Sequence, residues 1–218
     1  MAGLEVVVFD MDGVLVDSEP YWIRDSIEFF RRRGIDIPYR EATKVVGLSM
    51  KDTDALELSW WGNCMSLEEY HAIRYSDPDR LVLNSDEAVM PYAKYVLPRL
   101  KEAGLTVAIA SSSTRRSIDR MLDECGLRPY VDMRVSGADF EQSKPNPEIY
   151  LHTVERLGVP KECVVAVEDS TVGVQAATAA GLTTIARLDA RYDFDQSAAD
   201  YIVGDLLQAY DVITRLMR

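Results

Sequence analysis

The sequence predicts an α/β fold: a parallel β-sheet with helices on both faces, and a small α-helical domain inserted after the first strand. Two observations lead to this prediction. Apolar, β-branched runs recur along the chain with helical segments between several of them, a pattern typical of parallel strands buried on both sides. The interval between the first run and the second, residues 18–85, is helical in character and contains no convincing apolar strand.

Six apolar runs are expected to form the strands. They cover residues 4–9, 105–110, 131–135, 163–167, 183–188 and, as the weakest of the six, 201–203. The helices between them are marked by their end signals. Asn146, Pro147 and Glu148 are typical of a helix start, with Asn146 as the N-cap and Pro147 at the first helical position. The glycines expected to end helices are Gly126, Gly158 and Gly181.

The helical interval divides the predicted fold. We expect residues 1–17 and 86–218 to form one discontinuous α/β core, and residues 18–85 to form a helical domain entered and left through two linkers. Stretches such as EFFRRRG and SLEEYHAIRY carry its helical patterns. We expect Trp60 and Trp61 in the core of this domain rather than in a ligand site. The alternative is an ordinary helical excursion that packs on the main core.

Composition and charge narrow the functional classes. The chain has 218 residues, of which 47% are hydrophobic, as in a soluble globular protein. Its formal net charge of −12 makes nucleic acids and anionic membranes poor partners. No run approaches the ~18 apolar residues of a membrane span, and the N-terminus lacks signal-peptide features. Cys64, Cys125 and Cys163 are scattered without metal-ligand spacing, so we expect free thiols and a cytoplasmic location.

Acidic residues stand where the first apolar run ends. Asp10 and Asp12 follow VVVF one residue apart, and Gly13 and Asp17 come soon after. Like carboxylates at the edge of a core repel each other, and removing them from water is costly unless a cation or a shared proton compensates. The stretch therefore predicts a cation site, with Asp17 as a turn or hinge residue.

Polar residues follow three further predicted strands as well. In open α/β sheets ligands bind outside the carboxyl ends of the strands, so we expect these residues to share one crevice with Asp10 and Asp12. Carboxylates suit Mg²⁺, hydroxyls and helix N-terminal amides suit phosphate, and a lysine adds positive charge. Taken singly, the serines could cap a helix, the acids could favour a helix dipole and the lysine could be a surface residue. The residues are Ser111, Ser112, Ser113, Lys144, Glu168 and Asp169.

Four stretches carry a family resemblance. FDMDGVLVDSE, IASSS, SKPNPEIY and AVEDSTVG resemble, in this order and spacing, the four motifs of the haloacid dehalogenase-like phosphohydrolases. The similarity spans nearly the whole chain, and the helical interval lies where that superfamily carries its cap domain. The sequence is most similar to the subgroup of sugar-phosphate phosphatases and β-phosphoglucomutases. The resemblance implies a Rossmann-like core and a phosphoric monoester hydrolase.

The resemblance also implies a role for each site residue. Asp10 would be the nucleophile that forms an aspartyl-phosphate, and Asp12 the general acid and then the general base. Ser111, Ser112 and Lys144 would hold the transferring phosphoryl group. Mg²⁺ would be held by Asp10, the carbonyl of Asp12 and Asp169, with Glu168 beside the ion or bonded to its water.

The acceptor of the phosphoryl group decides the reaction. Water makes the enzyme a phosphatase, whereas a sugar hydroxyl makes it a mutase that must also hold a distal phosphate. Trp22, Val46 and Met50 stand where β-phosphoglucomutases place a histidine, a lysine and an arginine, although Lys44 and Lys51 lie nearby. We therefore expect a monomeric phosphatase of a small phosphorylated metabolite. The alternatives are a β-phosphoglucomutase-like phosphotransferase and a non-catalytic phosphometabolite-binding protein.

Overall fold

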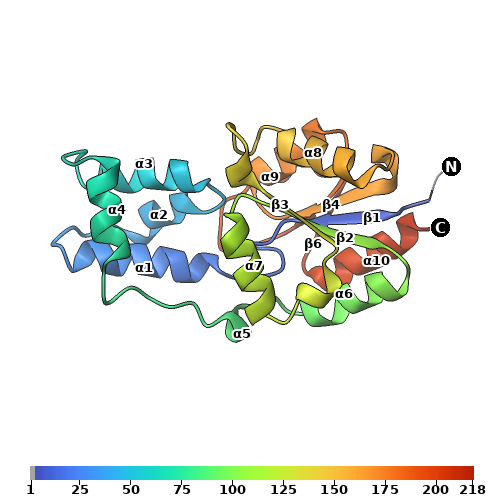
Figure 1. Ribbon diagram of the computed structural model, residues 1–218, viewed down its shortest axis with the longest axis horizontal. Coiled ribbons are helices and arrows are strands. Elements are labelled where there is room, and N and C mark those ends of the chain that lie inside the picture. The colour runs from blue at the N-terminus through green and yellow to red at the C-terminus, as the bar shows by residue number, and fades with distance from the viewer. Residues whose placement is uncertain (1–2) are drawn as a thin grey trace. The chain divides into compact units, whose positions relative to one another are not determined.

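The computed structural model describes residues 3–218 of the chain (Figure 1). Over these residues it contains a six-stranded sheet with the order β3-β2-β1-β4-β5-β6, in which every neighbouring pair is parallel. The predicted α/β fold is confirmed. The strands are β1 (Val6–Phe9), β2 (Thr106–Ser111), β3 (Met133–Ser136), β4 (Val164–Glu168), β5 (Thr183–Arg187) and β6 (Tyr201–Val203).

Helices cover both faces of the sheet, which explains why the central strands read as continuous apolar runs. Every residue of β1 and β4 is buried. Figure 1 shows α8 and α9 on one side of the sheet and α6 and α10 on the other, while α7 packs against β3. The helices are α5 (Ser85–Ala88), α6 (Ala93–Glu102), α7 (Arg115–Glu124), α8 (Glu148–Leu157), α9 (Thr171–Ala179) and α10 (Leu206–Leu216), with short 3₁₀ turns at Arg128–Tyr130, Gly137–Asp139 and Lys161–Cys163.

The register of the central strands fixes where the site lies. β1 pairs with both β2 and β4, so that Phe9 lies beside Ile109 and Val167. The residues that follow these three positions therefore reach the same carboxyl edge of the sheet.

The start of α8 differs by one residue from the prediction. The helix begins at Glu148, and Pro147 rather than Asn146 occupies the N-cap position. Asn146 still acts as a cap, because its side-chain Oδ1 accepts a hydrogen bond from the N–H of Glu148 at 2.8 Å. The predicted end is correct: Gly158 closes the helix with a φ of 68°, in the left-handed region that glycine tolerates.

The chain forms two compact units. One contains the sheet and consists of the residues up to Asp17 together with Ser85–Arg218; the other consists of Ser18–Asn84. The second unit, all of whose residues are described, contains no strand. Its helices are α1 (Glu19–Arg31), α2 (Tyr39–Ala42), α3 (Met50–Trp60) and α4 (Leu67–Tyr75), with a 3₁₀ turn at Thr43–Val45.

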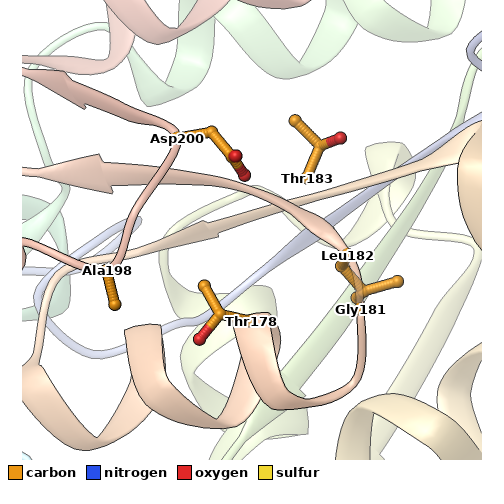
Figure 2. Close-up of a pocket in the computed structure, with 6 residues that line it drawn as sticks. All are labelled: Thr178, Gly181, Leu182, Thr183, Ala198 and Asp200. Atoms are coloured by element: carbon orange, nitrogen blue, oxygen red, sulfur yellow. The ribbon is translucent and has the colours of Figure 1, made fainter.

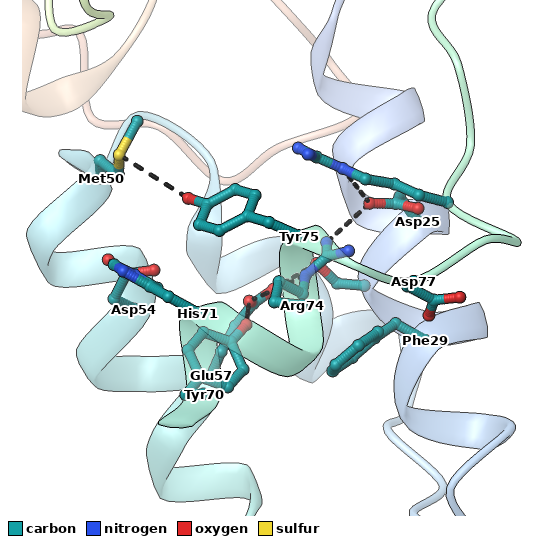
Figure 3. Close-up of polar contacts among 12 residues, drawn as sticks. Asp25, Phe29, Met50, Asp54, Glu57, Tyr70, His71, Arg74, Tyr75 and Asp77 are labelled. Carbon is teal, nitrogen blue, oxygen red and sulfur yellow. Dashed lines mark hydrogen bonds and ion pairs between the residues drawn. The ribbon is translucent and has the colours of Figure 1, made fainter. Parts of the chain in front are cut away.

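The helical unit has its own core, part of which is charged. The rings of Phe29, Trp61 and Tyr70 contact one another edge to face. Beside them, Arg74 pairs with Asp25 at 2.7 Å and with Glu57 at 3.6 Å, and the Tyr70 hydroxyl donates to Glu57 (Figure 3). Because the charges are buried, their mutual pairing offsets the cost of removing them from water. The cluster links α1, α3 and α4.

Among residues 3–218, no helix has the length and the apolar character that crossing a membrane requires.

Candidate active site

Asp10 lies at the carboxyl edge of the sheet, directly after β1. Its N–H continues the ladder between β1 and β4 by donating to the carbonyl of Val167 at 2.9 Å. The chain then turns at Gly13, where φ is +77° and the N–H donates to the carbonyl of Val16 at 2.8 Å. A Cβ at Gly13 would lie 2.0 Å from Oδ2 of Asp169. Glycine is thus required for two reasons, the positive φ and the close approach of the loop that follows β4.

Lys144 is the buried cation of the site. Its Nζ donates to Oδ1 of Asp10 at 2.8 Å, to Oε1 of Glu168 at 2.6 Å and to the carbonyl of Ala110 at 2.9 Å. Burial alone would lower the pKa of this amine, but the negative charges of Asp10 and Glu168 outweigh it and raise the pKa well above its ordinary value. Lys144 is therefore a charged ammonium whose three protons are all engaged.

Glu168 is fully buried at the end of β4, so its carboxylate needs hydrogen-bond donors from the protein in place of water. Lys144 and the hydroxyl of Tyr150 both donate to its Oε1. Burial raises the pKa of Glu168, and the positive charge of Lys144 opposes the shift. Tyr150 is a site residue that was not predicted. Its place in SKPNPEIY, six residues after Lys144, was the available signal.

Three carboxylates gather where a cation was predicted. Asp10, Glu168 and Asp169 are buried, and each offers one oxygen in a set whose members all lie within 4.8 Å of one another. Lys144 is the ammonium paired with two of them. This leaves an excess of negative charge that a divalent cation would neutralise. A donor set made only of oxygen fits Mg²⁺, a hard cation.

The side chain of Asp12 has a different environment. It is half-buried, and its Oδ2 accepts hydrogen bonds from the hydroxyls of Ser113 at 3.0 Å and Ser111 at 3.4 Å. The main-chain N–H of Ser113 also donates to Oγ of Ser111 at 3.1 Å, which fixes the Ser111 hydroxyl against the backbone of Ser113. Ser112 lies between them and is half-buried. The contact of Ser113 with Asp12 was not predicted, although Ser113 was recognised as part of the serine cluster.

A surface pocket elsewhere in the sheet unit is lined by none of the predicted site residues. It has a volume of about 360 Å³ and lies at the amino end of β5, the edge opposite to the carboxylates (Figure 2). Its position argues against a part in the same chemistry, because ligands of open α/β sheets bind at the carboxyl ends of the strands. The lining residues are Thr178, Gly181, Leu182, Thr183, Ala198 and Asp200.

Comparisons with known proteins identify the family. Residues 4–181 match the model of the haloacid dehalogenase-like hydrolases. The chain is 33% identical over 193 residues to a phosphorylated carbohydrates phosphatase of Thermotoga maritima, covering 84% of each protein. It is 32% identical over 183 residues to hexitol phosphatase B of Escherichia coli, covering 82% of this chain and 81% of that one. The chain belongs to the haloacid dehalogenase-like hydrolase family, and the predicted family is confirmed.

Its relationship to these proteins makes it an enzyme of the phosphoric monoester hydrolase class. A solved structure agrees in fold: β-phosphoglucomutase of Clostridium difficile has a TM-score of 0.79 to this chain. That alignment covers 98% of this chain and 97% of the other at 22% sequence identity.

Proposed function

We propose that the protein is a Mg²⁺-dependent phosphatase of small phosphorylated metabolites, with sugar and polyol phosphates as substrates. The proposal rests chiefly on the pairing of Asp10 with Lys144, beside Glu168 and Asp169, at the carboxyl edge of a parallel sheet. This arrangement provides an anion that can attack phosphorus and positive charge for the phosphate under attack. The names of two relatives, a phosphatase of phosphorylated carbohydrates and a hexitol phosphatase, support the substrate class.

In the first half of the reaction, a carboxylate oxygen of Asp10 attacks phosphorus and forms an aspartyl-phosphate while the ester P–O bond breaks. Asp12 gives its proton to the leaving alkoxide as the general acid. The two carboxylates differ in their contacts. Asp10 accepts a hydrogen bond from the ammonium of Lys144, which places positive charge beside the attacking oxygen, and Asp12 accepts hydrogen bonds from the hydroxyls of Ser111 and Ser113.

In the second half, Asp12 is a carboxylate and accepts a proton from the water that attacks phosphorus. The P–O bond to Asp10 breaks, inorganic phosphate leaves and Asp10 returns to its starting state. Ser111, Ser112 and Lys144 hold the phosphoryl group in both halves. Lys144 acts through its positive charge, because its three protons are engaged by Asp10, Glu168 and the carbonyl of Ala110. Lys144 keeps its charge for this task because Asp10 and Glu168 raise its pKa.

The residues that would hold Mg²⁺ are Asp10, Glu168, Asp169 and the main-chain carbonyl of Asp12. The ion would offset the repulsion between a carboxylate and a phosphate, both of which are negative. The net charge of −12 repels an anionic substrate, so the positive charge of the ion and of Lys144 would be needed to attract the phosphate into the site.

We further propose that the helical unit Ser18–Asn84 is the cap domain, whose side chains select the substrate. We also propose that the enzyme works as a monomer in the cytoplasm. Cys64, Cys125 and Cys163 are free thiols, which suits a reducing compartment.

Water is the acceptor that the helical unit favours. A mutase needs charged partners for a second phosphate, each worth ~1.5 to 3 kcal/mol. Val46, at one of the matching positions, is buried, and Met50 at another is apolar and half exposed. The nearby Lys44 already pairs with Glu41 at 2.7 Å. These features support hydrolysis over transfer to a sugar.

A substrate panel tests the proposal. We expect Mg²⁺-dependent phosphate release from hexose 6-phosphates or smaller polyol phosphates, without a bisphosphate activator and with loss of release in EDTA. A second assay supplies β-glucose 1-phosphate, Mg²⁺ and the 1,6-bisphosphate, and follows glucose 6-phosphate and free phosphate together. Isomerisation faster than phosphate release would favour the mutase and point to Lys44 or Lys51 as the distal clamp. No release from any member of the panel would contradict the proposed substrate class.

A further inference from the structure

Buried polar side chains lie in the loop between β5 and β6, residues 188–200, and at the last residue of β5, outside all four sequence motifs. Arg187, Asp189 and Gln196 are exposed to only 8%, 5% and 4%. Buried polar groups are costly unless they are hydrogen-bonded, so their partners show what they hold.

Gln196 holds the main chain at Asp169. Its Nε2 donates to the carbonyl of Asp169 and, at 2.9 Å, to the carbonyl of Arg187. Both partners are acceptors, so an amide NH₂ can serve them, whereas a carboxylate or an apolar group cannot. Gln196 thereby fixes the peptide that follows one of the carboxylates of the acidic cluster.

Arg187 holds the other loop of the site. Its Nε donates to the carbonyl of Gly13 at 2.6 Å, and a second nitrogen pairs with Asp189 at 2.8 Å. Arg191 pairs with the same Asp189 and reaches Asp17 with two hydrogen bonds of 2.8 and 2.7 Å. Burial alone would raise the pKa of Asp189, but hydrogen bonds from Arg191 and Arg187 keep this pKa far below its ordinary value. Asp189 is therefore an anion that fixes both guanidinium groups.

These contacts hold the loop after β1 next to the loop after β4. The loop after β1 carries Asp12 next to Gly13, and the carboxylate of Asp169 lies against the backbone of Gly13. Gln196 and Arg187 are joined to each other through the carbonyl of Arg187. Arg187 and Gln196 thus hydrogen-bond both the loop after β1 and the loop after β4, and these two loops carry proposed Mg²⁺ ligands.

We propose that Gln196 and Arg187 are positioning residues, which hold the loop after β4 against the loop after β1 and so set the metal affinity of the site. The inference rests on the proposed metal site. Groups that orient metal ligands from behind typically contribute 10- to 100-fold to metal affinity or activity. Sequence patterns do not reveal such residues, because neither Gln196 nor Arg187 belongs to any of the four motifs.

The test measures metal binding directly. Mn²⁺ serves as the probe, and its dissociation constant is measured by the EPR signal of the free ion, alongside the unfolding temperature, kcat and KM. We expect Gln196→Leu to raise the dissociation constant of Mn²⁺ at least about tenfold and to lower kcat more than it raises KM. Gln208→Leu is the matched control, because the side chain of this exposed glutamine is also hydrogen-bonded to the backbone, where it accepts the N–H of Gly204 at 2.9 Å, but it lies on α10, away from the site. It should leave Mn²⁺ binding unchanged.

The possible failures can be told apart. If native protein binds Mn²⁺ and folded Gln196→Leu binds it equally well, the positioning role is wrong, even when the variant is less stable. If native protein binds no Mn²⁺, the proposed metal site fails and the inference fails with it. Arg187→Lys provides a second variant, should Gln196→Leu not fold. It keeps the charge but lacks the planar fork that reaches Gly13 and Asp189 together, so we expect weaker Mn²⁺ binding there too.

Discussion

Lys144 shows how a single residue sets the charge balance of the site. A buried ammonium is stable only with partners, and here the partners are Asp10 and Glu168. The lysine holds both carboxylates at the sheet edge, and their negative charges raise its pKa, so that it stays protonated. Asp10 is therefore held at the sheet edge beside a fixed positive charge.

At this scale the first prediction concerns the nucleophile. Asp10→Asn keeps the size of the side chain but removes the attacking anion, so we expect phosphate release to fall at least ~10³-fold. Released phosphate measures the effect, and circular dichroism checks the fold. Asp211→Asn, at an exposed position of α10, is the control and should keep native activity. Normal turnover of Asp10→Asn would rule out the aspartyl-phosphate mechanism.

The second prediction separates Asp12 from Asp10. Asp12→Asn removes the proton donor, so phosphoryl transfer from an alkyl phosphate should slow by ~10² or more. An aryl phosphate with a good leaving group needs little protonation and should be slowed much less. Rapid-quench measurement of the first half-reaction with both substrates makes the comparison. Equal slowing of the two would count against Asp12 as the general acid.

At the scale of elements, the first turn of α9 packs directly on the site. Ser170 caps the helix by accepting the N–H of Gly173 at 3.1 Å, and Gly173 lies against Glu168. A Cβ at Gly173 would lie 2.0 Å from Oε2 of Glu168. Because Lys144 and Tyr150 hold that carboxylate in a fully buried position, it has little room to move.

Gly173→Ala therefore tests helix propensity against packing. Propensity alone would stabilise the protein by up to ~1 kcal/mol. We expect the clash to win, with a loss of ~1 to 3 kcal/mol of unfolding free energy and reduced phosphate release as Glu168 leaves Lys144. Urea unfolding followed by circular dichroism provides the measurement. Gly204→Ala is the control, since its Cβ would meet nothing closer than 3.5 Å. A Gly173→Ala protein as stable and active as the native one would contradict the packing argument.

At the scale of the whole molecule, the two compact units can be observed separately. Trp22, Trp60 and Trp61 are the three tryptophans of the chain, and all lie in the helical unit. Tryptophan fluorescence therefore reports on that unit, whereas circular dichroism reports on both. This difference allows a stability prediction to be made for the helical unit alone.

That prediction concerns acid stability. Burial alone would raise the pKa of Asp77, but hydrogen bonds from Arg32, the N–H of Asp79 and Arg33 lower it to about 2. A carboxyl whose pKa is lower in the folded state stabilises the fold above its unfolded pKa. Its contribution is lost as the pH falls from about 4 to about 2.

We expect Asp77→Asn to destabilise the helical unit by ~1.5 kcal/mol at pH 7 and by clearly less at pH 3. Urea unfolding followed by tryptophan fluorescence at both pH values measures the two differences. Asp36→Asn, at an exposed position of the same unit, should have little effect at either pH. A difference for Asp77→Asn that does not change with pH would argue that its charge is not responsible.

The sheet and most residues of the candidate site could be predicted from the sequence. Strands buried on both faces must be apolar throughout, so β1 and β4 could be found as continuous runs. The ends of parallel strands meet at one edge, which is why residues distant in the sequence could be predicted to converge. The structure brings these predicted residues together: Asp10, Asp12, Ser111, Lys144, Glu168 and Asp169.

The contacts that hold these groups in place became visible only in the folded chain. Tyr150 lies in a recognised motif, but its contact with Glu168 could not be read from it, and Gln196, which contacts Asp169, lies in no motif. Arg187 reaches Gly13 across 174 positions of the chain. The physical reason is that the position of a strand follows from the burial of its own residues. A hydrogen bond across the fold depends instead on where two separate loops come to lie once the whole sheet has formed.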